Sequence, residues 1–255
     1  MKMYKFLLLL LIPITFTGCL EINEDITVSK AGAGNYAMKM DMGQLIDMMQ
    51  SFIPEDQKAE IERPRDTTVL LKDYLDTATS LTAEQKSLLR DGSMHLNMNM
   101  AQKIMKMEMM YPFTSPANLQ KLYVNLDKSA GGFGNMLGAM GGGGGNAPMQ
   151  SPNLNKISSY YDLLADKSSI SRKLNKERFA AMQNDSMMSQ LKDMSGMAGM
   201  MGDMKMNMTI HLPAAARSIT GSKASLSADK KTVTVQNNML DVFEHPEYFE
   251  FSVQY

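Results

Sequence analysis

Methionine is the residue type whose number and spacing could do chemistry in this chain, because it occupies 28 of 255 positions. Two Met-x-Met runs and one looser run stand out: Met38, Met40 and Met42; Met204, Met206 and Met208; and Met194, Met197, Met200 and Met201. Thioether sulfurs are soft donors that favour Cu(I). Alternate side chains on a strand are about 6.6 Å apart, so flexible thioethers could converge on one ion. These runs raise the hypothesis of a Met-rich periplasmic Cu(I)-binding protein.

The same methionines also fit the buried face of a β-sheet. Within residues 203–213 every even position is apolar and every odd position before Pro213 is polar, which predicts a strand with one buried and one solvated face. Similar stripes occur at 35–42, 93–101 and 104–111. Methionines in such a core are not accessible to copper, so we favour a core role for them and no bound metal. The alternative Cu(I) ligands are then the loop residues Met194, Met197, Met200 and Met201.

A third interpretation treats the methionine face as an adaptable apolar groove. Burying one Met side chain costs up to about 2 kcal/mol of rotamer entropy, more than Leu or Ile costs. A core built this way adapts its shape but specifies it poorly. Such a face could hold a lipid or a segment of a partner protein, although large apolar surfaces are usually satisfied internally.

Catalytic motifs are missing from the sequence. His95 and His211 lie on the polar faces of expected strands and would meet only if those strands were neighbours, and His245 lies in a turn. The chain contains no His-Glu-x-x-His, no nucleophile elbow and no Walker loop. We therefore predict no enzyme, no catalytic residues and no cofactor.

Residues 1–18 have the composition of a secretory signal peptide. Lys2 and Lys5 form a basic start, and Phe6–Phe16 is almost wholly apolar. A spanning helix needs roughly 20 apolar residues, and Pro13 interrupts this shorter run. The sequence predicts that residues 1–18 are removed and that 19–255 form the mature chain.

Phe16-Thr17-Gly18-Cys19, at the end of this leader, resembles the lipobox of bacterial lipoproteins, with Phe16 where Leu is usual. The resemblance implies that Cys19 receives a diacylglyceryl group and, after cleavage, an acyl chain such as palmitate on its new amine. Cys19 is the sole cysteine and has no disulfide partner. Three acyl chains would anchor the protein firmly, because two already suffice.

In this family, the residue after the cysteine determines to which membrane the lipoprotein is delivered. An Asp there typically retains a lipoprotein in the inner membrane, so Leu20 implies export to the outer membrane. Glu21, Glu24 and Asp25 loosely resemble the early acidic residues that some bacteria read as a cell-surface signal. The resemblance thus implies a lipid-anchored envelope protein on the periplasmic or the surface face.

The charge balance argues against nucleic acid. The formal net charge is −1, and without Lys2 and Lys5 the mature chain has 24 basic against 27 acidic residues. No basic cluster outweighs that balance. The predicted partners are the membrane, through the lipid at Cys19, and other envelope proteins or a lipid, with no nucleic acid.

The hydrophobic pattern predicts a single α+β domain, in which antiparallel hairpins form a sheet and helices pack on its Met-rich face. Strands are predicted at 20–29, 35–42, 93–101, 104–111, 158–167, 169–174, 203–213, 223–228, 231–236 and 248–254. Helices are predicted at 44–53, 66–75, 82–92, 115–126 and 176–192, with a helical turn at 239–243. Residues 130–152 include five consecutive glycines, so we expect a flexible Gly-rich insertion within the domain.

Three elements of this pattern resemble the LppM-like envelope lipoproteins: the first hairpin after the anchor, the strand ending in Leu212-Pro213, and the hairpin that follows. That family usually closes its second hairpin strand with a Trp, whereas this chain has Val233-Thr234-Val235. The resemblance implies an antiparallel sheet with helices and no established enzyme chemistry. We therefore predict a non-enzymatic envelope lipoprotein with a structural or interaction role.

Overall fold

The computed structural model describes residues 20–46, 63–76, 81–126, 156–182 and 203–255. Its strands are β1 (Leu20–Val28), β2 (Gly34–Asp41), β3 (Arg65–Leu70), β4 (Ser93–Asn99), β5 (Ile104–Phe113), β6 (Tyr161–Ala165), β7 (Ser169–Leu174), β8 (Met204–His211), β9 (Ser218–Thr220), β10 (Ala224–Leu226), β11 (Thr232–Asn238) and β12 (Phe251–Gln254). Its helical segments are η1 (Gly43–Leu45), α3 (Lys72–Leu75), α4 (Ala83–Leu89), η2 (Met100–Gln102), a helix over residues 116–126, α6 (Lys156–Ser159), α7 (Lys176–Ala181), α10 (Asp241–Glu244) and η4 (Pro246–Phe249). The predicted α+β class is confirmed.

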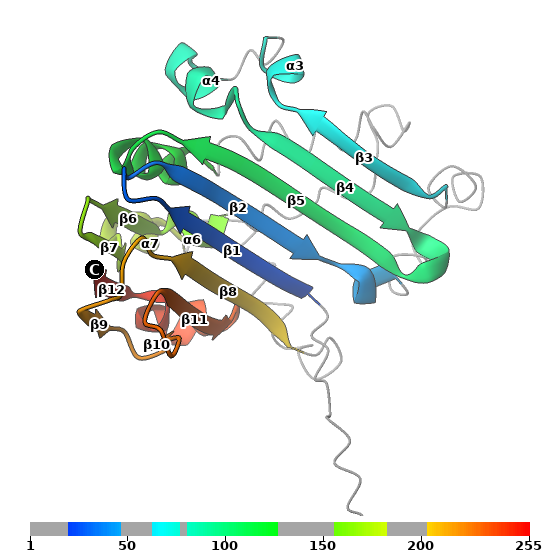
Figure 1. Cartoon of the computed structure of the whole chain (residues 1–255). Helices are drawn as coiled ribbons and strands as arrows, with labels where there is room; N and C mark the ends of the chain where they lie inside the picture. Colours follow the sequence, from blue (N-terminus) through cyan, green and yellow to red (C-terminus); the bar gives the residue numbers. More distant parts are fainter. Residues whose placement is uncertain (1–19, 47–62, 77–80, 127–155, 183–202) are drawn as a thin grey trace, which may run out of the picture.

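The strands form two sheets, of which the larger has eight strands in the order β10-β11-β8-β1-β2-β5-β4-β3 (Figure 1). The predicted hairpins β1–β2, β4–β5, β6–β7 and β10–β11 all pair antiparallel. Two features were not predicted. β8 pairs with β1 in parallel, which the long chain between them permits, and β6, β7, β12 and β9 form a separate four-stranded sheet.

Methionines line the inner face of the larger sheet, as their alternation predicted. Met204, Met206 and Met208 are 4%, 2% and 1% exposed. We call this layer the Met-rich face, and its other buried methionines are Met38, Met40, Met94, Met107 and Met109. The core interpretation of the strand methionines is thus confirmed.

The Met-rich face is covered by the helix over residues 116–126 and by the smaller sheet, which both lie behind the larger sheet in Figure 1. Ser115 begins this helix, because its Oγ accepts a hydrogen bond from the Asn118 backbone N–H at 3.2 Å. Tyr123 packs edge-on against Tyr36 of β2, with ring centroids 6.1 Å apart. The helix buries an apolar stripe that consists of Leu119, Leu122, Tyr123 and Leu126.

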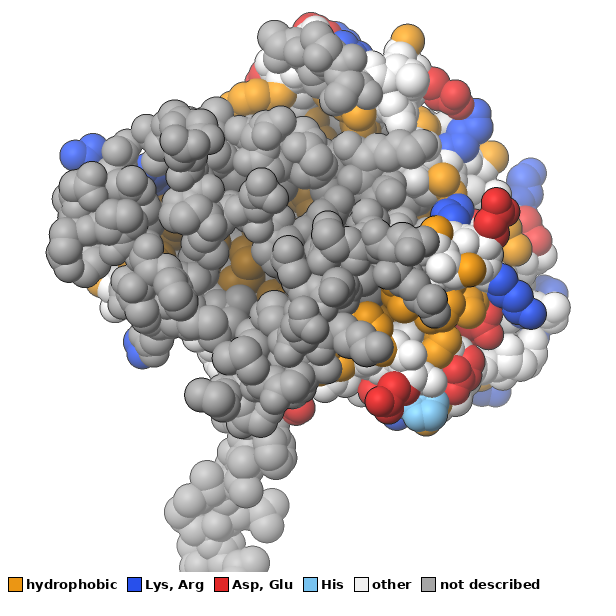
Figure 2. Space-filling view, turned by 180° about the vertical axis from the view of Figure 1, so that it is seen from behind, with side chains coloured by type: hydrophobic (Ala, Val, Ile, Leu, Met, Phe, Trp, Pro, Cys, Tyr) orange, Lys and Arg blue, Asp and Glu red, His pale blue; other side chains and the backbone are white. Residues whose placement is uncertain are grey.

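Figure 2 shows the molecule from behind, on the side of the smaller sheet. The described side chains visible there mix Lys and Arg with Asp and Glu, so neither sign dominates that surface. Among the described residues, no helix combines the length and the hydropathy that crossing a membrane requires.

Three helix and strand predictions were wrong in part. The strand predicted at 248–254 begins only at Phe251, because Pro246–Phe249 form η4. The predicted helix from Asp66 is instead the edge strand β3 followed by the short helix α3. Thr67, Thr68 and Val69 are β-branched and favour a strand once β4 offers an edge to pair with. The predicted strand at 158–167 begins only at Tyr161, because the preceding residues form α6.

Several predictions fall outside the described residues. They are the leader 1–18, Cys19, most of the helix at 44–53, the insertion at 130–152, the last part of the helix at 176–192, and the loop methionines Met194, Met197, Met200 and Met201.

The burial of the Met-rich face predicts a contrast between neighbouring positions on β8. Met208→Ala should lower the free energy of unfolding by about 2–5 kcal/mol, because it removes a fully buried side chain. Thr209→Ala, on the opposite face, should cost less than about 1 kcal/mol. Urea unfolding of both variants measures this, and equal losses would contradict the assignment of the two faces.

Candidate functional site

The predicted lipidation site leads directly into the sheet. Cys19 itself lies outside the described residues, but the next residue, Leu20, is the first residue of β1 and is 3% exposed. Leu20 pairs in register with Met204 of β8. A group attached to Cys19 would therefore be joined to a central strand by a single peptide bond.

The methionine candidates for copper are divided by the structure. Met38, Met40, Met204, Met206 and Met208 are buried and Met42 is partly buried, all against other core side chains. In that setting these thioethers pack as apolar side chains of the core. Copper binding by the loop set Met194, Met197, Met200 and Met201 stays a prediction, because those residues are not described.

The histidines do not come together. His95 on β4 and His211 on β8 are separated by three strands of the same sheet, which places β4 and β8 about 19 Å apart. His95 Nε2 lies 2.7 Å from Asp66 Oδ1, and His211 Nε2 lies 3.3 Å from Asp25 Oδ2. His245 stacks on Tyr248 with ring centroids 4.6 Å apart. Within the described ranges, no group of three His, Cys, Asp or Glu side chains is arranged to hold a metal.

The structure reveals a buried polar network that the sequence did not predict, centred on Glu24. Glu24 lies on the inner face of β1, in register with Met208 on one side and Met38 on the other. Its Oε1 accepts hydrogen bonds from the Tyr36 hydroxyl and the Ser158 hydroxyl, both at 2.8 Å. A carboxylate in the middle of a methionine layer is therefore fully engaged rather than exposed to solvent.

Arg172 of β7, in the smaller sheet, supplies the counter-charge. Its Nη1 donates to Glu24 Oε2 at 2.8 Å, and its Nε donates to the Phe249 carbonyl at 2.7 Å. The guanidinium carbon also lies 5.5 to 5.9 Å from three ring centroids, those of Tyr161, Phe249 and Phe251. Cation–π attraction of this kind is stronger where water is absent.

Burial controls the ionisation of this network. Burial raises the pKa of Tyr36 well above its ordinary value, and the charge of Glu24 raises it further. Burial likewise raises the pKa of Tyr123 and of Tyr161, with Arg172 opposing the rise in both. Burial disfavours the charged form of Arg172, but Tyr123 and Glu24 outweigh it, so the pKa of Arg172 is raised.

Chemically, this network is suited to joining the two sheets rather than to catalysis. Both Glu24 oxygens are occupied, and Glu24 and Arg172 are each 1% exposed, so a substrate has no path to either charge. Removing one partner of a buried pair typically costs about 3–5 kcal/mol, because the other charge is left buried and uncompensated. The signal in the sequence was that each charge occupies an inward position, Glu24 between Ile22 and Ile26 and Arg172 between Ile170 and Leu174.

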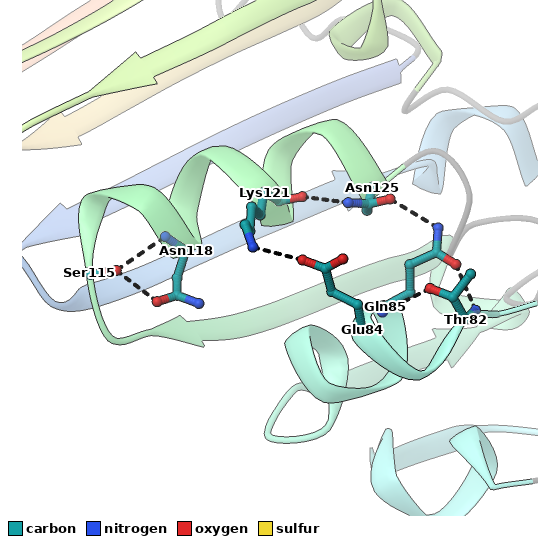
Figure 3. A network of polar contacts seen from close by, with 7 residues as sticks. All are labelled: Thr82, Glu84, Gln85, Ser115, Asn118, Lys121 and Asn125. Atoms are coloured by element: carbon teal, nitrogen blue, oxygen red, sulfur yellow. Dashed lines mark hydrogen bonds and ion pairs between the residues drawn. The ribbon is translucent and has the colours of Figure 1, made fainter.

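A second polar network attaches α4 to the helix over residues 116–126 (Figure 3). Lys121 Nζ donates to Glu84 Oε1 at 2.7 Å, and this hydrogen bond lowers the pKa of Glu84. Gln85 Nε2 donates to Asn125 Oδ1 at 2.9 Å. Thr82 and Gln85 also form a capping box at the start of α4, within the predicted helix at 82–92. These contacts hold α4 in place, and the side chains satisfy one another.

The outer face of the larger sheet is the solvated face, turned towards the viewer in Figure 1. We call it the polar face, and its outward residues on the central strands are Glu21, Asn23, Asp25, Thr27, Lys39, Asp41, Lys106, Glu108, Lys205, Asn207, Thr209 and His211. Its charges pair across strands, as Lys39 with Glu108 at 3.5 Å and Lys106 with Asp41 at 3.4 Å. Exposed pairs of this kind contribute at most about 1 kcal/mol each. The face is thus polar and self-compensated in charge.

Comparison with known proteins gives one distant likeness. The NMR structure of the folded domain of LppM from Mycobacterium tuberculosis is similar over 95% of this chain and 93% of that domain. The identity is 11% and the TM-score is 0.34. A TM-score of this size does not establish a shared fold. No protein-family model and no curated protein matches the chain.

The raised tyrosine pKa values predict loss of stability in alkali. Unfolded tyrosines lose their protons near pH 10, whereas buried Tyr36 holds its proton to higher pH. The stabilisation is complete below pH 10 and falls above it, by about 1.4 kcal/mol per pH unit for each such tyrosine. Tyr36→Phe should reduce the slope of the free energy of unfolding against pH by that amount, as measured by urea unfolding at several alkaline pH values.

An unchanged slope for Tyr36→Phe would contradict the assignment of Tyr36 as a group that stays protonated in the folded state.

Proposed function

We propose that this protein is a lipid-anchored, non-enzymatic envelope lipoprotein of the outer membrane, with a structural or interaction role. The observation that carries the proposal is the run Phe16-Thr17-Gly18-Cys19 at the end of a signal-like leader. The beginning of β1 at Leu20 supports it, because cleavage before Cys19 would leave every described element intact. Leu20 in place of Asp supports the outer membrane as the destination.

The interior supports a role without catalysis. The strongest buried charges, Glu24 and Arg172, neutralise each other between the two sheets. The histidines lie apart, each beside a carboxylate at the surface. Among the described residues, the buried charges and the histidines therefore already have partners within the domain.

The polar face supports an interaction role. It spans the central strands of an eight-stranded sheet and presents amides, hydroxyls and charges in alternation. Partners recognised by such a face would be bound through hydrogen bonds, since its charges already compensate one another. We propose other envelope proteins as those partners, with the membrane held through the lipid at Cys19.

Acylation of Cys19 predicts that the protein incorporates a labelled palmitate analogue in bacterial cells. The Cys19→Ser variant should incorporate none, because its hydroxyl does not replace the thiol that receives the lipid. Labelling is measured on the purified protein after lipid that is not covalently attached has been removed.

The control is Lys30→Cys introduced into the Cys19→Ser background, which restores a thiol at an exposed turn. It should not restore labelling, since the lipobox and not merely a thiol is required. Label that persists in Cys19→Ser would reject the proposal.

A further inference from the structure

We propose that the anchor holds the larger sheet upright on the membrane, with the end at which β1 and β8 begin against the lipid headgroups. This inference rests on the acylation of Cys19 proposed above, and it adds the orientation and the contact surface of the domain.

The first step is that no linker residue separates the lipidated Cys19 from Leu20, the first residue of β1. Leu20 is buried and is already paired with Met204 of β8, and Glu21 pairs with Asp41 of β2. Adjacent Cα atoms are about 3.8 Å apart. The sulfur that carries the lipid is therefore attached within one residue of a strand held on both sides, so the lipid leaves the domain close to the beginning of β1.

The second step identifies which surface meets the headgroups. β1 and β8 begin at the same end of the sheet because they are parallel, and β2 and β11 end there because they are antiparallel to those strands. We call this end the anchor rim, and its marking residues are Glu21, Asp41, Gln44, Lys205 and Asn238. The turn η2, which joins β4 to β5, lies at this end as well, since Asp41 is in register with Lys106.

The third step gives the height of the opposite end. β1 runs for nine residues from Leu20 to Val28, which is about 26 Å at the usual rise per residue. The turn after β1, which contains Lys30, therefore lies well outside the headgroup layer. In this orientation the polar face is perpendicular to the membrane plane and is accessible from the side.

Charge does not set this orientation. Among the described residues, the anchor rim combines Glu21 and Asp41 with Lys205, and the neighbouring Lys106 lies 3.4 Å from Asp41. Attraction to anionic lipids requires a cluster of basic residues, whereas this rim mixes both signs. The covalent link at Cys19 is then the determinant, and the orientation should not depend on salt.

The test measures the height of two sites in the full-length acylated protein, one in the turn after β1 and one in η1, which follows β2. Gln44→Cys and Lys30→Cys each introduce one free thiol at an exposed position, at the anchor rim and at the far turn. Each is labelled with a donor dye in phosphatidylcholine vesicles that carry a headgroup-attached acceptor. Energy transfer should be at least about twofold greater from position 44, because the sites differ in height by about 26 Å. Equal transfer would overturn the proposal.

A variant with an added flexible linker tests whether the direct connection between Cys19 and β1 sets the orientation. Insertion of one Leu and twelve Gly and Ser residues between Cys19 and Leu20 keeps Leu after the cysteine and adds a flexible span of about 19 Å. The difference between the two sites should then largely disappear, and its persistence would overturn the proposal. Loss of the acyl groups themselves is detected separately by mass spectrometry, and it would reject the proposed function together with this orientation.

Discussion

The buried pair of Glu24 and Arg172 is the contact on which the joining of the two sheets depends. Each sheet contributes one charge to a region from which water is excluded. Moving either ion out of water costs several kcal/mol, which only close geometry and further hydrogen bonds can offset. Tyr36, Ser158 and the Phe249 carbonyl supply those bonds. Because neither charge is satisfied until both sheets meet, the network admits one arrangement of the sheets and disfavours others.

This constraint complements a core that is otherwise permissive. Methionine fills irregular space well but specifies shape weakly, because its side chain is long and unbranched. The row that contains Met208, Glu24 and Met38 places the directional contact within the adaptable layer. The inner face therefore uses methionine for volume and the ion pair for position. The polar face and the anchor rim are the surfaces that we propose contact envelope proteins and the membrane.

From the sequence, it was easier to predict the buried and the solvated face of each strand than to predict which strands lie beside it. Strict alternation placed Met204, Met206 and Met208 inside, which the structure confirms. Alternation does not say which strand lies beside which, so the parallel pairing of β1 with β8 between distant parts of the chain could not be predicted. Glu24 was interpreted only as an acidic residue near the anchor, because its partner is 148 positions away. Its inward position, like that of Arg172, was the available sign of a buried pair.

A double-mutant cycle tests most directly whether the two charges act as one unit. Glu24→Gln, Arg172→Met and the combination of both are compared with the parent protein by urea unfolding. We expect each single substitution to cost about 3–5 kcal/mol, because it leaves the remaining group buried without its partner. The combination should cost at least about 2 kcal/mol less than the sum of the two. Additivity to within about 0.5 kcal/mol would contradict the central role of the pair.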